Sequence, residues 1–471
     1  MLQLCRINWG SGCCAMRQRK DLLLQTGWAC SVGLMVLLLF SHAYNDILIT
    51  ARHGINFWNI LFDGDILHFF ELNYVVSGNN YYNIIQGCAY NILYYVIFAV
   101  WNIPMAVLNA FTDVDVMNNI ICIAYMKSLT VAAMLTSVII LQKILLLLNG
   151  DRRDQKLVSF LYLTSSLMMA VVFIVCQYDL ISVVFQLFGV QAFLEKKDKR
   201  FVLFFGIAFC LKYFSILLFM PLLLLRHKRI ISWITAIIGM MIPWALTSLP
   251  FAKSYDRLAT ELTDDLVGKL FSYSGSGYSL FVVFYCLLLV WCFLQEDDES
   301  FSRKVVWAGF VTYGLFCSLL DGYLYWTVMF APFMVLLISQ VPRYLYLNLL
   351  LETLGYACLV VGHMIHYRNF FFGDTMKSMI MSRIVSERAL NYDGSWVYFI
   401  MGQLGMKEWV FPACNSVFFA AVVAMAFLGY PGKRITAENP LQLNRDCREM
   451  IVLRLLIASG ICLLPILSLF I

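Results

Sequence analysis

Charged residues are scarce in this sequence. Asp, Glu, Lys and Arg make up 13% of the 471 residues, whereas hydrophobic residues make up 61%. A soluble globular domain has about a quarter charged residues and about half apolar ones. The composition therefore excludes a water-soluble enzyme, and the abundance of Phe, Leu, Ile and Tyr excludes a disordered chain. A polytopic integral membrane protein remains.

Several functional motifs are also missing. The 15 cysteines form no CxxC pair and the six histidines form no HExxH motif, so we predict no metal ligands and no catalytic zinc. No basic tract is long enough to bind nucleic acid, so no nucleic-acid partner is predicted. The sequence shows no internal repeat of the kind that marks transporters built from two halves.

The apolar runs predict an all-α polytopic membrane protein with about 11–13 transmembrane helices in a single domain, residues 1–471. A spanning helix needs about 20 apolar residues. Candidate spans lie near 22–44, 120–148, 157–176, 180–194, 230–248, 276–295, 304–320, 323–340, 349–366, 409–429 and 450–470. The first run follows Arg17, Arg19 and Lys20 and is too long for a signal peptide, so we expect an uncleaved helix with a cytoplasmic N-terminus.

Two further apolar stretches, 87–112 and 201–225, are assigned by the positive-inside rule. Basic clusters at 152–153, 196–200, 226–229, 303–304 and 433–434 should all be cytoplasmic. Residues 45–119 then form one long external loop with juxtamembrane or re-entrant helices. Residues 201–225 enter and leave on the cytoplasmic side as two short helices that break near Lys212. The active surface should be extracytoplasmic, in the cell membrane.

The first candidate functional group follows the first apolar run. Asp46 lies at the membrane edge, where charges are costly and therefore often functional, and a carboxylate there could act as a general base on a hydroxyl. Arg52 and His53 come next as candidate substrate-binding residues. Asp63 and Asp65 are further acidic candidates, and as an Asp-x-Asp pair they could form a turn or hold a divalent cation.

The second group lies between apolar stretches farther along the chain. Gln177, Tyr178 and Asp179 separate two runs that are otherwise uncharged. Lys212 is surrounded in sequence by Phe, Tyr and Leu, so its ammonium must snorkel or find an anion, for which a phosphate oxygen is a natural partner.

Aromatic and basic residues of the second half complete the candidate set. Tyr323 and Trp326 could belong to an interfacial aromatic belt or form a surface on which a sugar stacks. Arg368 lies in the late external loop, where a guanidinium suits a phosphate-bearing glycan or lipid head.

These residues resemble the core of the GT-C fold glycosyltransferases. The resemblance rests on Cys176–Asp179, a basic turn at 195–199, Lys212 in the next apolar stretch, and the Pro-Leu run at 221–224. It is greatest to bacterial proteins related to the second mannosyltransferase of GPI-anchor synthesis, whose motif reads Gly-Gln-x-Asp. Cys176 replaces the usual Gly. The resemblance covers roughly residues 40–230.

The resemblance implies a catalytic module in 1–230 followed by variable helices and loops in 231–471. Such enzymes transfer a hexose, for example mannose, with inversion from a polyprenyl-phosphate sugar to a lipid or glycan hydroxyl outside the cytoplasm. Asp46 matches the position of the catalytic aspartate and Asp179 a second acidic site, with Asp63 or Asp65 as a rival base. No cofactor is required because the leaving group is already a phosphate, although a divalent cation remains an open alternative.

Two other classes of function fit the sequence. A transporter or flippase of lipid-linked glycans would explain the many helices and the expected helix breaks. A glycan polymerase or ligase would share the external loops but would use a diphosphate donor. All three functions require membrane lipid as surroundings and a lipid-linked glycan as substrate.

Overall fold

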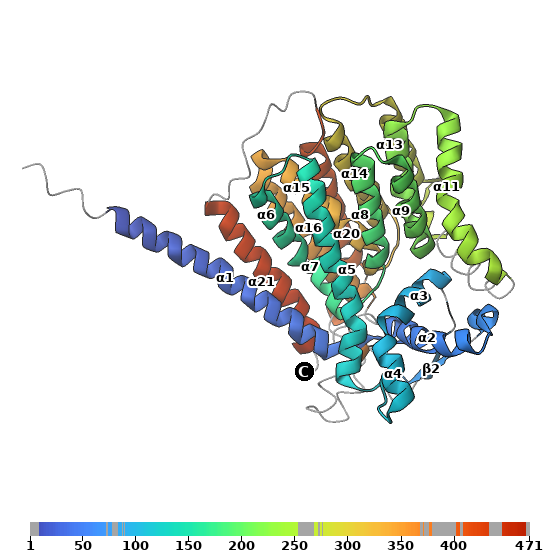
Figure 1. Ribbon diagram of the computed structural model, residues 1–471. Coiled ribbons are helices and arrows are strands. Elements are labelled where there is room, and N and C mark those ends of the chain that lie inside the picture. Colours follow the sequence, from blue (N-terminus) through green and yellow to red (C-terminus); the bar gives the residue numbers. More distant parts are fainter. Residues whose placement is uncertain are drawn as a thin grey trace, which may run out of the picture.

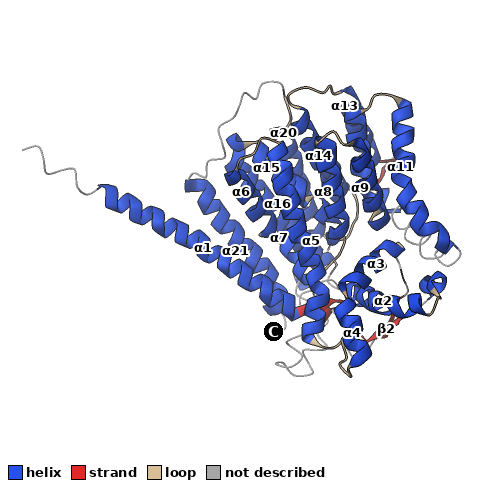
Figure 2. Ribbon diagram, viewed as in Figure 1, coloured by secondary structure: helices blue, strands red, loops and turns tan. Residues whose placement is uncertain are grey.

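The protein is a helical bundle with a smaller helical module at one end (Figure 1). The computed structural model describes residues 9–71, 74–77, 83–86, 88, 90–252, 268–271, 274–275, 277–367, 371, 376–378, 402–405, 408–432 and 445–467. Within these residues, the strands form three short antiparallel pairs (Figure 2).

The N-terminal elements form the first long helix and the module. They are α1 (Trp9–Ser41), β1 (His42–Tyr44), α2 (Asn45–Phe62), the 3₁₀ helix η1 (Ile66–Glu71), β2 (Tyr74–Ser77), β3 (Asn83–Gln86), α3 (Ile92–Trp101) and α4 (Ile103–Phe111). In Figure 1, α2 lies across the lower end of the bundle, and α1 leaves the bundle at an angle beside α21 (Arg445–Leu467).

The central elements build most of the bundle. They are α5 (Ile120–Leu147), α6 (Arg152–Leu163), α7 (Ser166–Met169), the π-helix η2 (Ala170–Ile174), α8 (Leu180–Leu194), α9 (Asp198–Leu211), η3 (Tyr213–Ser215), α10 (Ile216–Arg226), α11 (Ile230–Ser248) and η4 (Leu249–Phe251).

The remaining elements complete the bundle. They are β4 (Ser274–Gly275), β5 (Tyr278–Ser279), α13 (Leu280–Leu294), α14 (Phe301–Leu319), η5 (Leu324–Met329), α15 (Ala331–Gln340), η6 (Pro342–Tyr344), α16 (Leu345–His366), β6 (Met376–Ser378) and α20 (Val410–Leu428), followed by α21.

Five helices of the described residues are long and apolar enough to cross a membrane, and the number becomes seven if two bent helix pairs each count as one span. The five lie at Ile120–Leu147, Ile230–Phe251, Pro342–His366, Val410–Leu428 and Arg445–Leu467. Each coincides with a segment that the sequence predicted to span. The structure therefore agrees with an all-α polytopic membrane protein.

The predicted interruption of 87–112 is confirmed. Helices α3 and α4 meet at Asn102 with a bend of 65°. Pro104 lies in the first turn of α4, a position where its missing N–H costs no helical hydrogen bond. The stretch therefore cannot run as one straight helix.

The predicted break at Lys212 is also confirmed. Helix α9 ends there, where the backbone of Lys212 is extended, and α10 begins after the short turn η3. Arg226 at the end of α10 forms an ion pair of 3.0 Å with Asp198 at the start of α9. The two ends of the segment therefore lie together, and Lys212 is at the tip of a helical hairpin.

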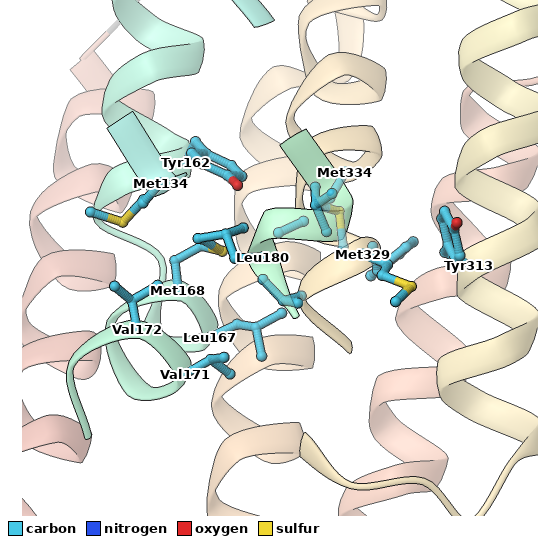
Figure 3. Close-up of a cluster of buried hydrophobic side chains, with 14 of the residues drawn as sticks. Met134, Tyr162, Leu167, Met168, Val171, Val172, Leu180, Tyr313, Met329 and Met334 are labelled. Carbon is cyan, nitrogen blue, oxygen red and sulfur yellow. The ribbon is translucent and has the colours of Figure 1, made fainter. Parts of the chain in front are cut away.

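Every residue of α7 and η2 is buried in the core. Figure 3 shows Met134 from α5, Met168 from α7 and Met334 from α15 converging with Leu180 at the start of α8. Methionine is flexible enough to fill irregular gaps, and a π-helix creates such gaps because its turn is wider than that of an α-helix. This packing fixes the end of η2, from which the Gln177–Asp179 turn extends.

A buried ion pair joins three helices of the bundle. The guanidinium of Arg454 in α21 makes two bonds to Glu352 in α16, with Nε–Oε2 at 2.7 Å and Nη2–Oε1 at 2.8 Å. Its Nη1 donates to the Thr164 hydroxyl next to α6, at 2.7 Å. Both charged residues are at most 2% exposed, so the pair is shielded from water and from screening by salt.

We expect Arg454→Met to lower the free energy of unfolding by about 3–5 kcal/mol, because it leaves the Glu352 carboxylate buried and uncompensated. Glu352→Leu combined with Arg454→Met should recover most of that loss. Arg445→Met on the same helix is the control: its pair with Glu449 is exposed and should contribute only about 0–1 kcal/mol. Denaturant unfolding in detergent measures all three, and equal losses for the two single variants would contradict the prediction.

Candidate active site

The site is centred on the carboxylate of Asp46, in the first turn of α2. Oδ2 accepts hydrogen bonds from Gln177 Nε2 at 2.7 Å and from the Tyr90 hydroxyl at 3.3 Å. Oδ1 accepts one from the Tyr178 hydroxyl at 3.2 Å. Donors from two distant segments therefore hold this carboxylate in one orientation while the residue stays partly exposed.

A second layer of contacts fixes Tyr178. Its hydroxyl lies 2.9 Å from Thr50 Oγ1, which in turn donates to the backbone carbonyl of Asp46 at 2.9 Å. Thr50 is one helical turn after Asp46, so both face the same side of α2. The rings of Tyr90, Tyr94 and Phe98 pack edge-on against the Tyr178 ring.

The turn that carries Gln177 depends on an unusual backbone angle. Cys176 follows the π-helix η2 and has φ +54°, in the left-handed region that favours glycine. The next N–H, of Gln177, bonds back to the carbonyl of Val171 at 3.2 Å, as in a helix-ending motif with a left-handed residue.

Asp179 and Lys212 form a buried ion pair beside Asp46. Lys212 Nζ lies 3.1 Å from Asp179 Oδ1, and the residues are 8% and 0% exposed. The Lys212 ammonium also lies 5.5–5.9 Å from the ring centroids of four aromatic residues, an arrangement that stabilises a cation; they are Tyr90, Phe214, Tyr325 and Trp326. Lys212, at the tip of the hairpin, thus places one positive charge close to the carboxylates of Asp179 and Asp46.

The electrostatics of Asp46 are set by burial and by this neighbouring charge. Loss of contact with water raises the pKa of the Asp46 carboxyl above its ordinary value. The Gln177 hydrogen bond, the positive charge of Lys212 and the tyrosine hydroxyls lower the pKa without cancelling the effect of burial. A carboxylate with a raised pKa holds an abstracted proton more readily than an ordinary aspartate.

One wall of the site comes from the segment after α14. The ring of Tyr323 stacks on Tyr325 and meets Trp326 edge-on. Lys269 Nζ lies 3.7 Å from the Tyr323 ring centroid and 4.7 Å from that of Trp326. Asp321 accepts a hydrogen bond from the Tyr367 hydroxyl at 2.8 Å. The second half of the chain therefore supplies an aromatic, partly cationic surface next to Lys212.

Seven of the predicted site residues gather here, from four separate parts of the chain. They are Asp46, Gln177, Tyr178, Asp179, Lys212 and Trp326, with Tyr323 packed against Trp326. Had Asp46 been placed at the other end of the bundle from the Gln177 turn, a shared site could not exist. The 2.7 Å contact between them excludes that arrangement.

The structure does not bring Asp63 and Asp65 to this cluster. Asp63 caps the far end of α2, about 25 Å along the helix from Asp46 at 1.5 Å per residue. Asp65 pairs instead with His68, and both side chains are mostly exposed. Gly64 between the two aspartates has φ +77°. The Asp-x-Asp motif therefore forms the turn that ends α2. Neither Asp63 nor Asp65 lies near the Asp46 carboxylate.

The other predicted binding residues lie elsewhere. His53 is 1% exposed and its Nδ1 lies 3.2 Å from the Cys88 thiol, inside the small core of the α2–α4 module. Its ring therefore packs in this module rather than beside the Asp46 carboxylate. Arg52 is half-buried on α2, six residues along the chain from Asp46. Arg368 lies outside the described residues.

Sequence reasoning missed Tyr90, Thr50 and Lys269. Thr50 follows Asp46 by four residues, so helical spacing alone could have placed both on one face. Tyr90 lies just before α3 rather than within it, and Lys269 is one of several charged residues in the stretch 249–275, so neither gave a comparable signal.

Within the described residues, no group of three or more His, Cys, Asp or Glu side chains gathers in a way that could hold a metal ion. No protein-family model matches the sequence, and no curated protein shows significant similarity to it. The site itself consists of the positioned Asp46 carboxylate, the adjacent Lys212–Asp179 ion pair and the aromatic wall that includes Tyr323.

We expect Cys176→Val to lower the free energy of unfolding by about 1–3 kcal/mol, because a β-branched residue strongly disfavours the left-handed backbone at this position. Cys122→Val is the control. Cys122 is buried in the regular first turn of α5, where the same substitution should change stability by about 0.5 kcal/mol or less. Thermal unfolding in detergent compares the two, and a Cys176→Val variant as stable as Cys122→Val would contradict the expectation.

Proposed function

We propose that the protein is an inverting GT-C type glycosyltransferase that moves a hexose, such as mannose, from a polyprenyl-phosphate sugar to an extracytoplasmic lipid or glycan hydroxyl. The observation that carries this proposal is the Asp46 carboxylate, oriented by Gln177 and Tyr178 and placed beside the Lys212–Asp179 pair. The resemblance of residues 40–230 to that class of enzyme supports it.

Asp46 is the general base in this mechanism. A sugar or lipid hydroxyl has a pKa far above neutral, so its proton must leave as the glycosidic bond forms. Oδ1 and Oδ2 are held by their hydrogen-bond donors within a half-buried residue, and the proton passes to one of these oxygens. Gln177 and Tyr178 fix the direction from which the hydroxyl approaches.

Lys212 stabilises the leaving group. Breaking the bond to the anomeric carbon places additional negative charge on the polyprenyl phosphate, and a fixed ammonium favours that charge. Asp179 keeps the ammonium in place before the donor binds, at 3.1 Å. Tyr323, Tyr325 and Trp326 offer faces on which a sugar ring can stack. This mechanism uses no cofactor.

The proposed topology has 11–13 transmembrane helices, a cytoplasmic N-terminus and an extracytoplasmic site in the cell membrane. Five shorter apolar helices of 10–17 residues accompany the long ones and supply the additional crossings. The basic clusters at 196–200 and 226–229 lie at the ends of the 198–226 hairpin. Because such clusters favour the cytoplasm, the hairpin tip with Lys212 points toward the opposite face.

Asp46→Asn should lower the rate of sugar transfer by about 10²–10⁴-fold, because the amide keeps the shape of the side chain but cannot take the proton. Release of polyprenyl phosphate and labelling of membrane glycolipids measure transfer in proteoliposomes. Asp63→Asn, at the exposed far end of the same helix, is the matched control and should retain full activity. Full activity of Asp46→Asn would reject the base.

The choice of donor separates the proposal from its alternatives. Polyprenyl-monophosphate sugars should be consumed and diphosphate sugars should not. Consumption of the diphosphate donor alone would favour a polymerase or ligase. Movement of a lipid-linked glycan across the bilayer without any bond cleavage would favour a flippase.

The pH profile of kcat/KM should fall on the acid side through a pKa above that of an ordinary aspartate. The base must be deprotonated to act, and burial raises the pKa of Asp46, so activity is lost as pH drops through this raised value. Gln177→Leu removes a donor that favours the charged form and should move the acid limb to still higher pH. Gln191→Leu removes a similar 2.7 Å bond to Glu195 at the other end of α8 and should leave the limb unmoved.

A further inference from the structure

The two halves of the site belong to chain segments that meet only through folding. Asp46 follows α1 by way of the short strand β1, whereas Gln177, Tyr178 and Asp179 follow η2. The hydrogen bond between Asp46 and Gln177 joins residues 131 positions apart in the sequence. Helix α5 packs against both α1 and η2, and it carries a buried lysine, Lys127, at this junction.

The Lys127 side chain is 0% exposed. Its Nζ donates to the backbone carbonyls of Leu38 at 2.9 Å and Leu39 at 2.8 Å, in the last turn of α1. The free carbonyls at a helix C-terminus attract a cation. Lys127 therefore fixes the end of α1 a few residues before Asp46.

The same ammonium contacts the other half of the site. It interacts with the thiol of Cys176, which also interacts with the backbone of Tyr44, in the strand that leads to Asp46. A lysine ammonium has three N–H groups, and two carbonyls and one sulfur offer three acceptors. One turn later on α5, Thr130 Oγ1 lies 3.3 Å from the carbonyl of Val172 in η2.

We propose that Lys127 is a positioning residue for the Asp46 base. Its ammonium ties the end of α1 to the Cys176 turn, and this connection sets the contact between Asp46 and Gln177. The inference rests on the proposed function, because it assigns Lys127 a role in the activity of that site. Lys127 itself touches neither substrate nor the reacting atoms.

The chemistry of a lysine at this depth favours positioning over packing. A buried ammonium in a membrane protein is costly, and an apolar side chain of similar length would fill the space without that cost. What an apolar side chain cannot do is bond to acceptors on two separate segments at once. Replacing Lys127 should therefore loosen the relative placement of the segments more than it disturbs the core.

Lys127→Met is the central test. We expect kcat to fall on the order of 10²-fold, the effect of a misplacement of about 1 Å at a reacting group, with KM for the donor unchanged. The acid limb of the pH profile should move to higher pH, because a displaced Gln177 no longer favours charged Asp46. Lys127→Arg keeps a cation and should recover part of both effects.

Lys143→Met supplies the matched control, since it makes the same change at an exposed position of α5, and it should leave rate and pH profile unaltered. A Lys127→Met enzyme with full activity would overturn the proposal. So would a lower rate with an unmoved acid limb, because that result indicates only a smaller folded fraction.

A crosslinking experiment tests the same geometry without activity. Asp46→Cys and Gln177→Cys, combined, should be joined in high yield by a short bifunctional thiol reagent, with the single variants as background for the other cysteines. Adding Lys127→Met should lower the yield in protein that still elutes as a monodisperse species; an undiminished yield would overturn the positioning role. If the unsubstituted protein transfers no sugar, the proposed function fails, while the crosslinking result still decides whether Lys127 aligns the two segments.

Discussion

The hydrogen bond from Gln177 to the Asp46 carboxylate is the contact on which the arrangement of the site depends. At 2.7 Å it requires the first turn of α2 to lie directly against the turn before α8. Several otherwise unrelated features satisfy that requirement together. The π-helix η2 and the left-handed Cys176 direct Gln177 toward α2, and the end of α1 places Asp46 opposite to it.

The charges of the site are stabilised by one another more than by solvent. Two carboxylates and one ammonium lie in surroundings rich in aromatic rings, where a lone buried charge would be strongly disfavoured. Lys212 pairs with Asp179, and its positive charge lowers the pKa of both Asp179 and Asp46, whereas the charge of Asp46 raises the pKa of Asp179. The single ammonium therefore offsets part of the cost of burying two carboxylates side by side.

The sequence allowed prediction of those features that stand out against an apolar background. Asp46, Gln177, Asp179 and Lys212 were identifiable because polar residues inside or beside membrane helices are costly and rare. The hairpin at Lys212 was predictable because basic clusters flank both of its ends. The confirmed interruption at Asn102 followed from the neighbouring proline in the same way.

Other features could not be predicted because their signals were ambiguous or local. Asp63 and Asp65 looked like a functional pair, but short turns use the same residues. His53 looked like a ligand-binding residue, yet only tertiary packing shows that it is enclosed beside Cys88. Tyr90 could not be distinguished from the many aromatic residues of this chain. The number of membrane crossings could not be predicted from apolar runs whose helices are short or bent.

The β1–β6 strand pair has a consequence for biogenesis. Its register places Tyr44 opposite Met376, so the segment that leads to Asp46 is completed by residues synthesised more than 300 positions later. Helix α1 likewise packs against α21, where Gly27 lies close to Leu455. During membrane insertion, β1 therefore lacks its hydrogen-bonding partner β6 until the later segment is synthesised. The face of α1 that packs against α21 is likewise uncovered until α21 has inserted. Assembly of the cluster around Asp46 is consequently among the last events in the maturation of the protein.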